Sequence, residues 1–227
     1  MLISVHMPKT AGTSFLNSLQ KVFGERLLQH YSTPPDSTYM SDRAALLKYK
    51  FGVIWKGRKI VRRYDAIHGH FVPETFSFLP GPKQFCVFLR EPVDRTISHY
   101  LYWEKMGPLQ IPRHSVLDHV VRNHLTLNDF AALPEIVNYY STYLGRMSLE
   151  KFDFVGLQEE YNTSLCLFEK IFGVKLEEYR DNVVNREQYE HILSSVDLAK
   201  LRLAQAKNRE VYDQARRRFD LLCSQYL

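Results

Sequence analysis

Cysteine is scarce in this chain of 227 residues, and long apolar runs are missing. The three cysteines, Cys86, Cys166 and Cys223, stand far apart. No two of them have metal-ligand spacing, and an odd number gives no disulfide framework. We interpret all three as buried small hydrophobic residues in a reducing compartment. The first apolar run, Leu2–Val5, is too short for a signal sequence or a membrane span. We therefore expect no membrane span and a cytoplasmic location, in preference to a lumenal domain trimmed from an anchored protein.

A large excess of one charge is also missing. The chain has 30 Lys and Arg residues against 25 Asp and Glu, a net charge of +5. This mild excess favours an anionic ligand and is too small to predict a nucleic-acid partner. Hydrophobic residues make up 45% of the chain, which is typical of a globular domain with a buried core. The length predicts one α/β domain over residues 1–227.

Short apolar runs alternate with helical patterns along the chain. Four runs predict buried strands: Leu2–His6, roughly Ile60–His68, Gln84–Leu89 and Phe152–Leu157. Helical periodicity follows three of them, over Thr13–Phe23, Val93–Glu104 and Glu160–Phe172. This alternation predicts crossover units and a parallel sheet.

Two segments interrupt this alternation. Residues 31–59 contain a predicted short helix around Asp42–Tyr49, and residues 105–146 are predicted to form a helical layer over the sheet. A polar connection at 179–192 precedes a predicted helical region from Ser194 to Tyr226.

The stretch HMPKTAGTSF, His6–Phe15, links the first predicted strand to the first helix. Gly12 permits a tight turn, and we expect Thr13 or Ser14 to cap a helix that begins near Phe15. Main-chain N–H groups at a helix start bind anions, and Lys9 would add a positive charge. A Walker A loop is disfavoured because it needs Gly-Lys-[Ser/Thr] at the helix start. An ordinary surface turn is the alternative.

The stretch CVFLREPVDRTISHYLYW, Cys86–Trp103, contains a second candidate anion site. Arg90 directly follows a predicted strand, where open α/β sheets place their ligands, and Pro92 suits the first turn of a helix. Ser98 lies about two turns further along that helix. An arginine and a hydroxyl suit a phosphate monoester. A surface ion pair of Arg90 with Glu91 or Asp94 explains this stretch almost as well.

The stretch DAIHGHF, Asp65–Phe71, places two histidines two residues apart. In extended backbone, His68 and His70 point to the same side. We predict no metal site here, since no carboxylate or cysteine with suggestive spacing lies nearby. From these residues alone, a structural or surface role is the more common one.

Together, PKTAGTS and RxPxxRxxSxY resemble the two donor-binding motifs of sulfotransferases that use 3′-phosphoadenosine 5′-phosphosulfate (PAPS). The resemblance is closest to carbohydrate sulfotransferases of the heparan-sulfate/uronosyl 2-O-sulfotransferase type. It implies a three-layer, P-loop-like α/β fold and metal-independent, in-line transfer of a sulfuryl group to a carbohydrate hydroxyl. It also implies that the insertions at about 31–59 and 105–146 shape the acceptor site. It assigns the 5′-phosphosulfate loop to Lys9, Thr10, Ala11, Gly12, Thr13 and Ser14. It assigns the 3′-phosphate to Arg90 and Ser98, and less firmly a late loop over the nucleotide to Arg186.

In that family an HGH stretch supplies the catalytic base. The resemblance therefore implies that His70 is the base, with His68 in support, and that Lys9 stabilises the leaving phosphate. A neutral histidine has an ordinary pKa near 6.5, which suits this task. Two alternatives stay open: a nucleotide-dependent kinase with an atypical phosphate loop, and a catalytically inactive module that binds the nucleotide or a glycan. The sequence does not predict the acceptor's identity or the oligomeric state.

Overall fold

A parallel β-sheet forms the centre of the protein in the computed structural model, which describes residues 1–31, 52, 55–106, 120, 123–179, 189 and 196–227. The sheet of this described part has five strands in the order β2-β3-β1-β4-β5. Its strands are β1 (Leu2–Val5), β2 (Leu27–His30), β3 (Ala66–Gly69), β4 (Gln84–Leu89) and β5 (Phe154–Leu157). All neighbouring pairs run parallel. The predicted α/β class with a central parallel sheet is therefore confirmed.

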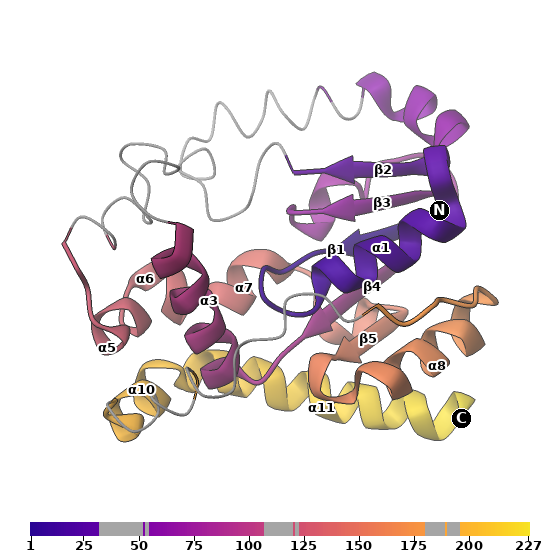
Figure 1. Ribbon diagram of the computed structural model, residues 1–227. Coiled ribbons are helices and arrows are strands. Elements are labelled where there is room, and N and C mark those ends of the chain that lie inside the picture. Colours follow the sequence, from indigo (N-terminus) through magenta and orange to yellow (C-terminus); the bar gives the residue numbers. More distant parts are fainter. Residues whose placement is uncertain (32–51, 53–54, 107–119, 121–122, 180–188, 190–195) are drawn as a thin grey trace.

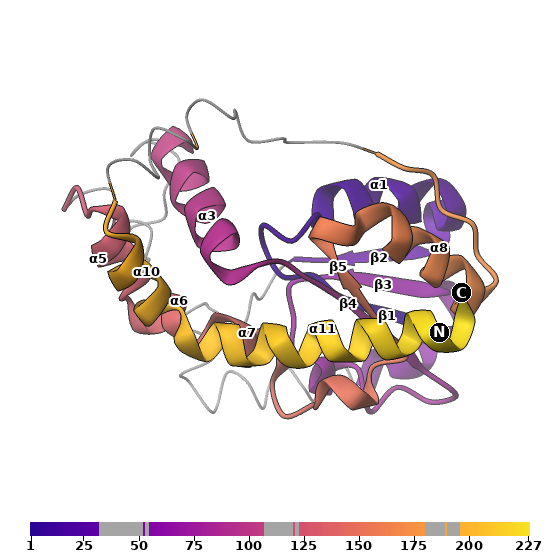
Figure 2. The same cartoon turned by 90° about the horizontal axis from the view of Figure 1, so that it is seen from below.

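Helices cover both faces of the sheet and give the predicted three layers. In Figure 2, α1 (Gly12–Phe23) and α8 (Tyr161–Phe172) lie on one face, and α11 (Ala206–Tyr226) runs along the other. The other described helices are α3 (Pro92–Met106), α5 (Leu127–Ala131), α6 (Pro134–Val137), α7 (Tyr139–Leu144) and α10 (Leu198–Ala204). Short 3-10 turns lie at Gly24–Arg26, Pro73–Thr75, Leu149–Lys151 and Gln158–Glu160. Among the described residues, no helix is long and apolar enough to cross a membrane.

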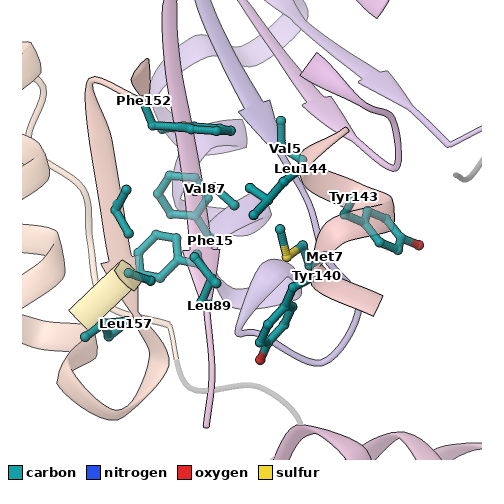
Figure 3. Close-up of a cluster of buried hydrophobic side chains, with 14 of the residues drawn as sticks. Val5, Met7, Phe15, Val87, Leu89, Tyr140, Tyr143, Leu144, Phe152 and Leu157 are labelled. Carbon is teal, nitrogen blue, oxygen red and sulfur yellow. The ribbon is translucent and has the colours of Figure 1, made fainter. Parts of the chain in front are cut away.

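Aromatic side chains join the sheet to the helices above it. Phe15 of α1 packs against Phe88 of β4 at 4.8 Å between ring centroids and against Phe168 of α8 at 5.5 Å. All three rings are buried. Figure 3 shows part of this core with Phe15 near Val87 and Leu89 of β4, and Tyr140, Tyr143 and Leu144 from α7. The start of α1, which carries the candidate loop, is thus fixed to the sheet by buried contacts.

Three of the four predicted strands are confirmed, and the second is only partly right. Residues 55–63 are helical, and β3 begins only at Ala66. Gly57 is buried and Ile60 and Val61 are half-buried, whereas Arg62 and Arg63 are exposed. The buried and half-buried positions 57, 60 and 61 have helical spacing. The adjacent apolar residues Ile60 and Val61 led to the wrong prediction that a strand begins there. The predicted strands also did not include β2, which is only four residues long.

Three smaller predictions differ from the structure. Only Cys86 is buried, while Cys166 is exposed and Cys223 is half-buried. Both lie on helices whose other faces pack on the core, so an apolar neighbourhood in sequence did not mean burial. The expected side-chain cap at Thr13 or Ser14 is wrong: α1 begins at Gly12, and its cap residue Ala11 has left-handed backbone and makes no side-chain cap.

The predicted insertions are described in part. Helices α5, α6 and α7 confirm a helical layer in the second half of 105–146. The helix predicted around residues 42–49 lies outside the described residues, as does most of the polar connection at 179–192. The C-terminal helical prediction is confirmed by α10 and α11.

The strand order marks one edge of the sheet as a ligand site. From β1 the chain moves outward to β2, returns through β3 and then crosses to β4 on the other side of β1. Such a reversal opens a crevice outside the carboxyl ends of the central strands, and open α/β sheets bind ligands there. The loop after β1 and the start of α3 after β4 lie at that end (Figure 1).

Candidate functional site

The loop after β1 has the backbone of an anion cradle. Lys9 and Ala11 have positive φ angles of 71° and 68°. A left-handed backbone costs a residue with a side chain roughly 1–2 kcal/mol. Such turns direct successive N–H groups into a concave surface, and the first amides of α1 have no acceptor within the helix. Strain of this kind persists where the surrounding structure enforces it and is concentrated at functional sites.

The hydroxyl side chains of the loop are not equivalent. Thr10 is buried, and its Oγ1 donates to the Met7 carbonyl at 2.8 Å. Its hydroxyl therefore holds the loop in shape. Thr13 is exposed, whereas Ser14 is buried.

Arg90 and Ser98 occupy the predicted second anion site. Arg90 directly follows β4, and α3 begins at Pro92, as predicted. Arg90 makes no side-chain hydrogen bond or ion pair with any described residue, so the predicted alternative of a pair with Glu91 or Asp94 is wrong. Glu91 instead pairs with Arg209, and Asp94 accepts a hydrogen bond from Tyr189. Ser98 is buried on α3.

Lys9 brings the two candidate anion sites together. Its ammonium lies over the ring of Tyr102 on α3, with Nζ at 4.4 Å from the ring centroid. Burial lowers the pKa of Lys9, and the nearby Arg90 charge lowers it further. The two cations, about eighty residues apart in sequence, thus repel each other at one edge of the sheet. Two cations that repel each other in this way favour the binding of anionic groups beside them.

The two predicted histidines lie at the carboxyl end of β3. His68 is fully buried, and its Nδ1 is 2.7 Å from Ser4 Oγ on β1. Burial, followed by the influence of His70, lowers the pKa of His68 to about 3. His68 is therefore neutral over the physiological range and is hydrogen-bonded inside the sheet.

His70 is held in one tautomer by the main chain. Its Nδ1 lies 2.8 Å from the carbonyl oxygen of His6. Since a carbonyl only accepts, Nδ1 carries the proton, and Nε2 of the neutral ring carries the lone pair. Gly69 allows this placement because a Cβ there would lie 1.8 Å from the His30 carbonyl oxygen on β2. The HGH order therefore has a steric reason at its centre.

A buried cation on α3 was not predicted. Arg95 is fully buried, and its guanidinium carbon lies 3.7 Å from the ring centroid of Tyr139. Its Nη1 donates to Nδ1 of His99 at 3.3 Å, and its Nη2 donates to Thr96 Oγ1 at 3.2 Å. No carboxylate pairs with it in the described part of the chain. The sequence offered one signal, its position between Arg90 and Ser98 in the motif.

His99 is a buried residue whose pKa responds to several groups of the candidate site. Burial is the largest cause that lowers its pKa, followed by Arg95, Lys9 and His70. These three groups therefore lie within electrostatic reach of one buried ring. The Tyr140 hydroxyl, on α7 beside Arg95, donates to the Arg90 carbonyl. This hydrogen bond links the main chain after β4 to helix α7.

Of the predicted site residues, the structure gathers Lys9, Arg90, Ser98, His68 and His70 at one edge of the sheet. Arg186 lies outside the described residues. Within the described ranges, no group of three or more His, Cys, Asp or Glu side chains could hold a metal ion. The arrangement can bind an anionic ligand beside a neutral imidazole with a defined acceptor nitrogen.

Comparisons with known proteins give a distant likeness. No protein-family model matches the chain, and no curated protein matches it. The structure of mouse sulfotransferase SULT7A1 complexed with 3′-phosphoadenosine 5′-phosphate (PAP) is similar over 89% of this chain, with 13% identity and a TM-score of 0.42. This chain spans about 65% of the length of that mouse protein. A sulfotransferase from Alicyclobacillus acidocaldarius matches over 90% of this chain and 95% of its own, with 16% identity and a TM-score of 0.35. Both TM-scores are below 0.5, so the function proposed below depends on the residues of the site.

Proposed function

We propose that this protein is a sulfotransferase that transfers a sulfuryl group from PAPS to a hydroxyl of a carbohydrate. One observation carries the proposal. Lys9 and Arg90 come from two different strand ends and lie within electrostatic reach of each other, and the same end of the sheet carries a histidine whose Nδ1 proton is fixed by a main-chain carbonyl. A double-ended anion such as PAPS needs two separate cationic sites, and a hydroxyl acceptor needs a neutral base.

His70 acts as the general base in this proposal. Its Nε2 accepts the proton of the acceptor hydroxyl while the hydroxyl oxygen forms a bond to sulfur and the bond from sulfur to the phosphate oxygen breaks. The proton on Nδ1 stays on that nitrogen and remains hydrogen-bonded to the His6 carbonyl oxygen, so the imidazolium that forms keeps its orientation. A positioned base typically contributes about 10²–10⁴-fold to the rate.

Lys9 and the loop amides balance the charge that grows on the leaving 5′-phosphate. Preorganised donors of this kind are worth most where charge develops during the reaction. Arg90 and Ser98 hold the 3′-phosphate, far from the bond that breaks, and thereby orient the donor. Lys9 thus has the catalytic task, while Arg90 has a binding task.

The charges of the site fit an anionic donor. Glu159, which lies in the 3-10 turn just before α8, is a carboxylate within electrostatic reach of Arg90. Burial raises the pKa of Glu159, and its oxygens accept hydrogen bonds from the Glu91 N–H and the Tyr212 hydroxyl. Glu159 therefore has other partners, which leaves the Arg90 guanidinium available to phosphate.

Thermal unfolding with nucleotides tests the proposal. We expect PAP to raise the unfolding temperature, because a ligand that binds only the folded state stabilises it, and ATP with magnesium to leave it unchanged. Transfer of labelled sulfate from PAPS to a panel of neutral and anionic glycans then tests the acceptor class. A shift with ATP and magnesium alone would favour the kinase alternative. PAP binding without transfer to any hydroxyl compound would favour an inactive binding module.

A further inference from the structure

The His6 ring lies between the candidate base and its supporting histidine. Its centroid is 4.5 Å from that of His70 and 4.9 Å from that of His68, and the His68 ring is nearly parallel to it, with 22° between the planes. Its Nδ1 is also 3.1 Å from the Tyr31 hydroxyl. The Tyr31 ring also meets His70 edge-on at 4.8 Å. The His6 ring therefore has neighbours that limit its movement.

The main chain of His6 is fixed as firmly as its ring. Its N–H donates to the Gly69 carbonyl at 2.8 Å, which continues the pairing of β1 with β3. Its carbonyl accepts from His70 Nδ1 at 2.8 Å. One residue thus defines both the tautomer of His70 and the surface on which the His70 ring rests.

The same ring sets the position of the donor loop. A Cβ at Gly12 would lie 1.6 Å from His6 Nε2 and 2.0 Å from its Cδ2. The ring cannot yield easily, because His68 and His70 pack against it. Position 12 must therefore be glycine as long as His6 is present, and the first residue of α1 rests directly on the histidine cluster.

We propose that His6 is a positioning residue that couples the donor loop to the base. This inference rests on the proposed function for the roles of the two parts that it links. The His6 ring sets how closely the start of α1 approaches the sheet, and it holds the His70 ring in the orientation in which Nε2 receives the proton.

A double-mutant cycle tests the coupling, with PAP affinity measured by calorimetry and transfer rate measured at saturating donor. We expect Gly12→Ala to weaken PAP binding at least tenfold, because the added methyl displaces the loop. We expect His6→Ala to change PAP affinity less than about threefold but to lower the transfer rate about 10- to 100-fold, within the range of a misplaced base. In the double variant, PAP affinity should return to nearly that of His6→Ala, while transfer stays slow.

Two results would overturn the coupling. One is additive loss of PAP affinity in the double variant, since independent sites add. The other is normal transfer by His6→Ala. If Gly12→Ala folds poorly, its unfolding temperature replaces PAP affinity as the measurement, and the double variant should unfold at a higher temperature than Gly12→Ala.

The His30→Ala variant serves as the matched control. His30 lies at the end of β2, and its ring packs on Phe76 at 5.3 Å and on Phe71 at 6.0 Å. We expect it to leave the Gly12→Ala defect unrelieved; relief by His30→Ala as well would overturn the specific role of His6. Failure of the proposed function would look different: the wild-type protein would not bind PAP, while the unfolding temperatures of the cycle would still report the contact between His6 and Gly12.

Discussion

The two sides of the candidate site differ in charge although they share one edge of the sheet. On the β1–β3 side, His6 is half-buried and His68 is fully buried, and desolvation is the main cause that lowers the pKa values of both imidazoles. On the β4–α3 side, Arg90 and Arg95 are guanidinium groups, which stay protonated in proteins. Desolvation thus keeps the imidazoles of the first side neutral, whereas the guanidinium groups make the second side positive. A base needs the first condition, and an anion site needs the second.

The largest expected effect is loss of the base. We expect His70→Ala to lower the transfer rate at saturating PAPS by about 10²–10⁴-fold and to leave PAP affinity nearly unchanged, since His70 belongs to the neutral side. Steady-state transfer and calorimetry measure the two quantities. The exposed His124 provides the control, because His124→Ala should change neither. Near-normal transfer by His70→Ala would remove its role as base.

Arg90 should show the opposite pattern. Hydrogen bonds to charged groups contribute roughly 1.5–3 kcal/mol, so we expect Arg90→Met to weaken PAP binding about 10- to 100-fold. The transfer rate at saturating PAPS should change much less, because Arg90 lies away from the reacting bond in the proposed mechanism. Lys151→Met removes one exposed positive charge elsewhere and should leave PAP affinity unchanged. An equal loss in both variants would mean that net charge alone, and no specific contact, drives binding.

Substitutions of Arg95 distinguish the effect of a buried charge on PAP affinity from the effect of a direct contact. Its side chain is fully buried, so we expect it to act on the donor through its electric field. At an effective dielectric constant of about 20, a unit charge about 10 Å away contributes roughly 1–2 kcal/mol before screening. PAP should therefore bind about fivefold more weakly to Arg95→Gln than to Arg95→Lys, which keeps the charge. Equal PAP affinity in the two variants would contradict this role.

The last prediction concerns the free energy of unfolding and its dependence on pH. The pKa of His68 is about 3 in the folded protein against the ordinary 6.5. Between these two pH values the imidazole is therefore protonated in the unfolded chain and neutral in the folded protein. Stability is therefore complete above pH 6.5 and decreases as the pH falls from 6.5 toward 3, by up to about 1.4 kcal/mol per pH unit. We expect unfolding midpoints in urea to show a shallower pH dependence for His68→Asn than for the wild type. His124→Asn should retain the wild-type dependence, and an unchanged slope in His68→Asn would show that His68 does not titrate in this way.

Local sequence patterns were enough to predict most of the sheet and the loop that links β1 to α1. Strands β1, β4 and β5 are continuous apolar runs, and Pro92 marks the start of α3. Residues 55–63 were harder, because Ile60 and Val61 are adjacent apolar β-branched residues within an otherwise basic segment. Only the burial of Gly57 shows which face of that helix packs inward. The four residues of β2 carry too little pattern to be recognised.

The position of a candidate site residue was predictable where a local sequence motif places it at the end of a strand. Lys9, Arg90 and His70 lie at strand ends that the sequence indicates. The roles of His6 and Tyr31 depend on contacts between separate strands, such as the His6–His70 hydrogen bond over 64 positions. The aromatic neighbours of Arg95 come from α7, whose position no local pattern specifies. Contacts of this kind appear only once the chain is folded.

Calorimetric titration of PAP into four proteins tests the central claim most directly: the wild type, Lys9→Ala, Arg90→Ala and His70→Ala. We predict that the wild type and His70→Ala bind PAP with similar affinity, and that Lys9→Ala and Arg90→Ala each bind it at least about tenfold more weakly, the loss expected for one charged hydrogen bond. Unchanged PAP affinity in both Lys9→Ala and Arg90→Ala would contradict the assignment of this edge of the sheet as the donor site.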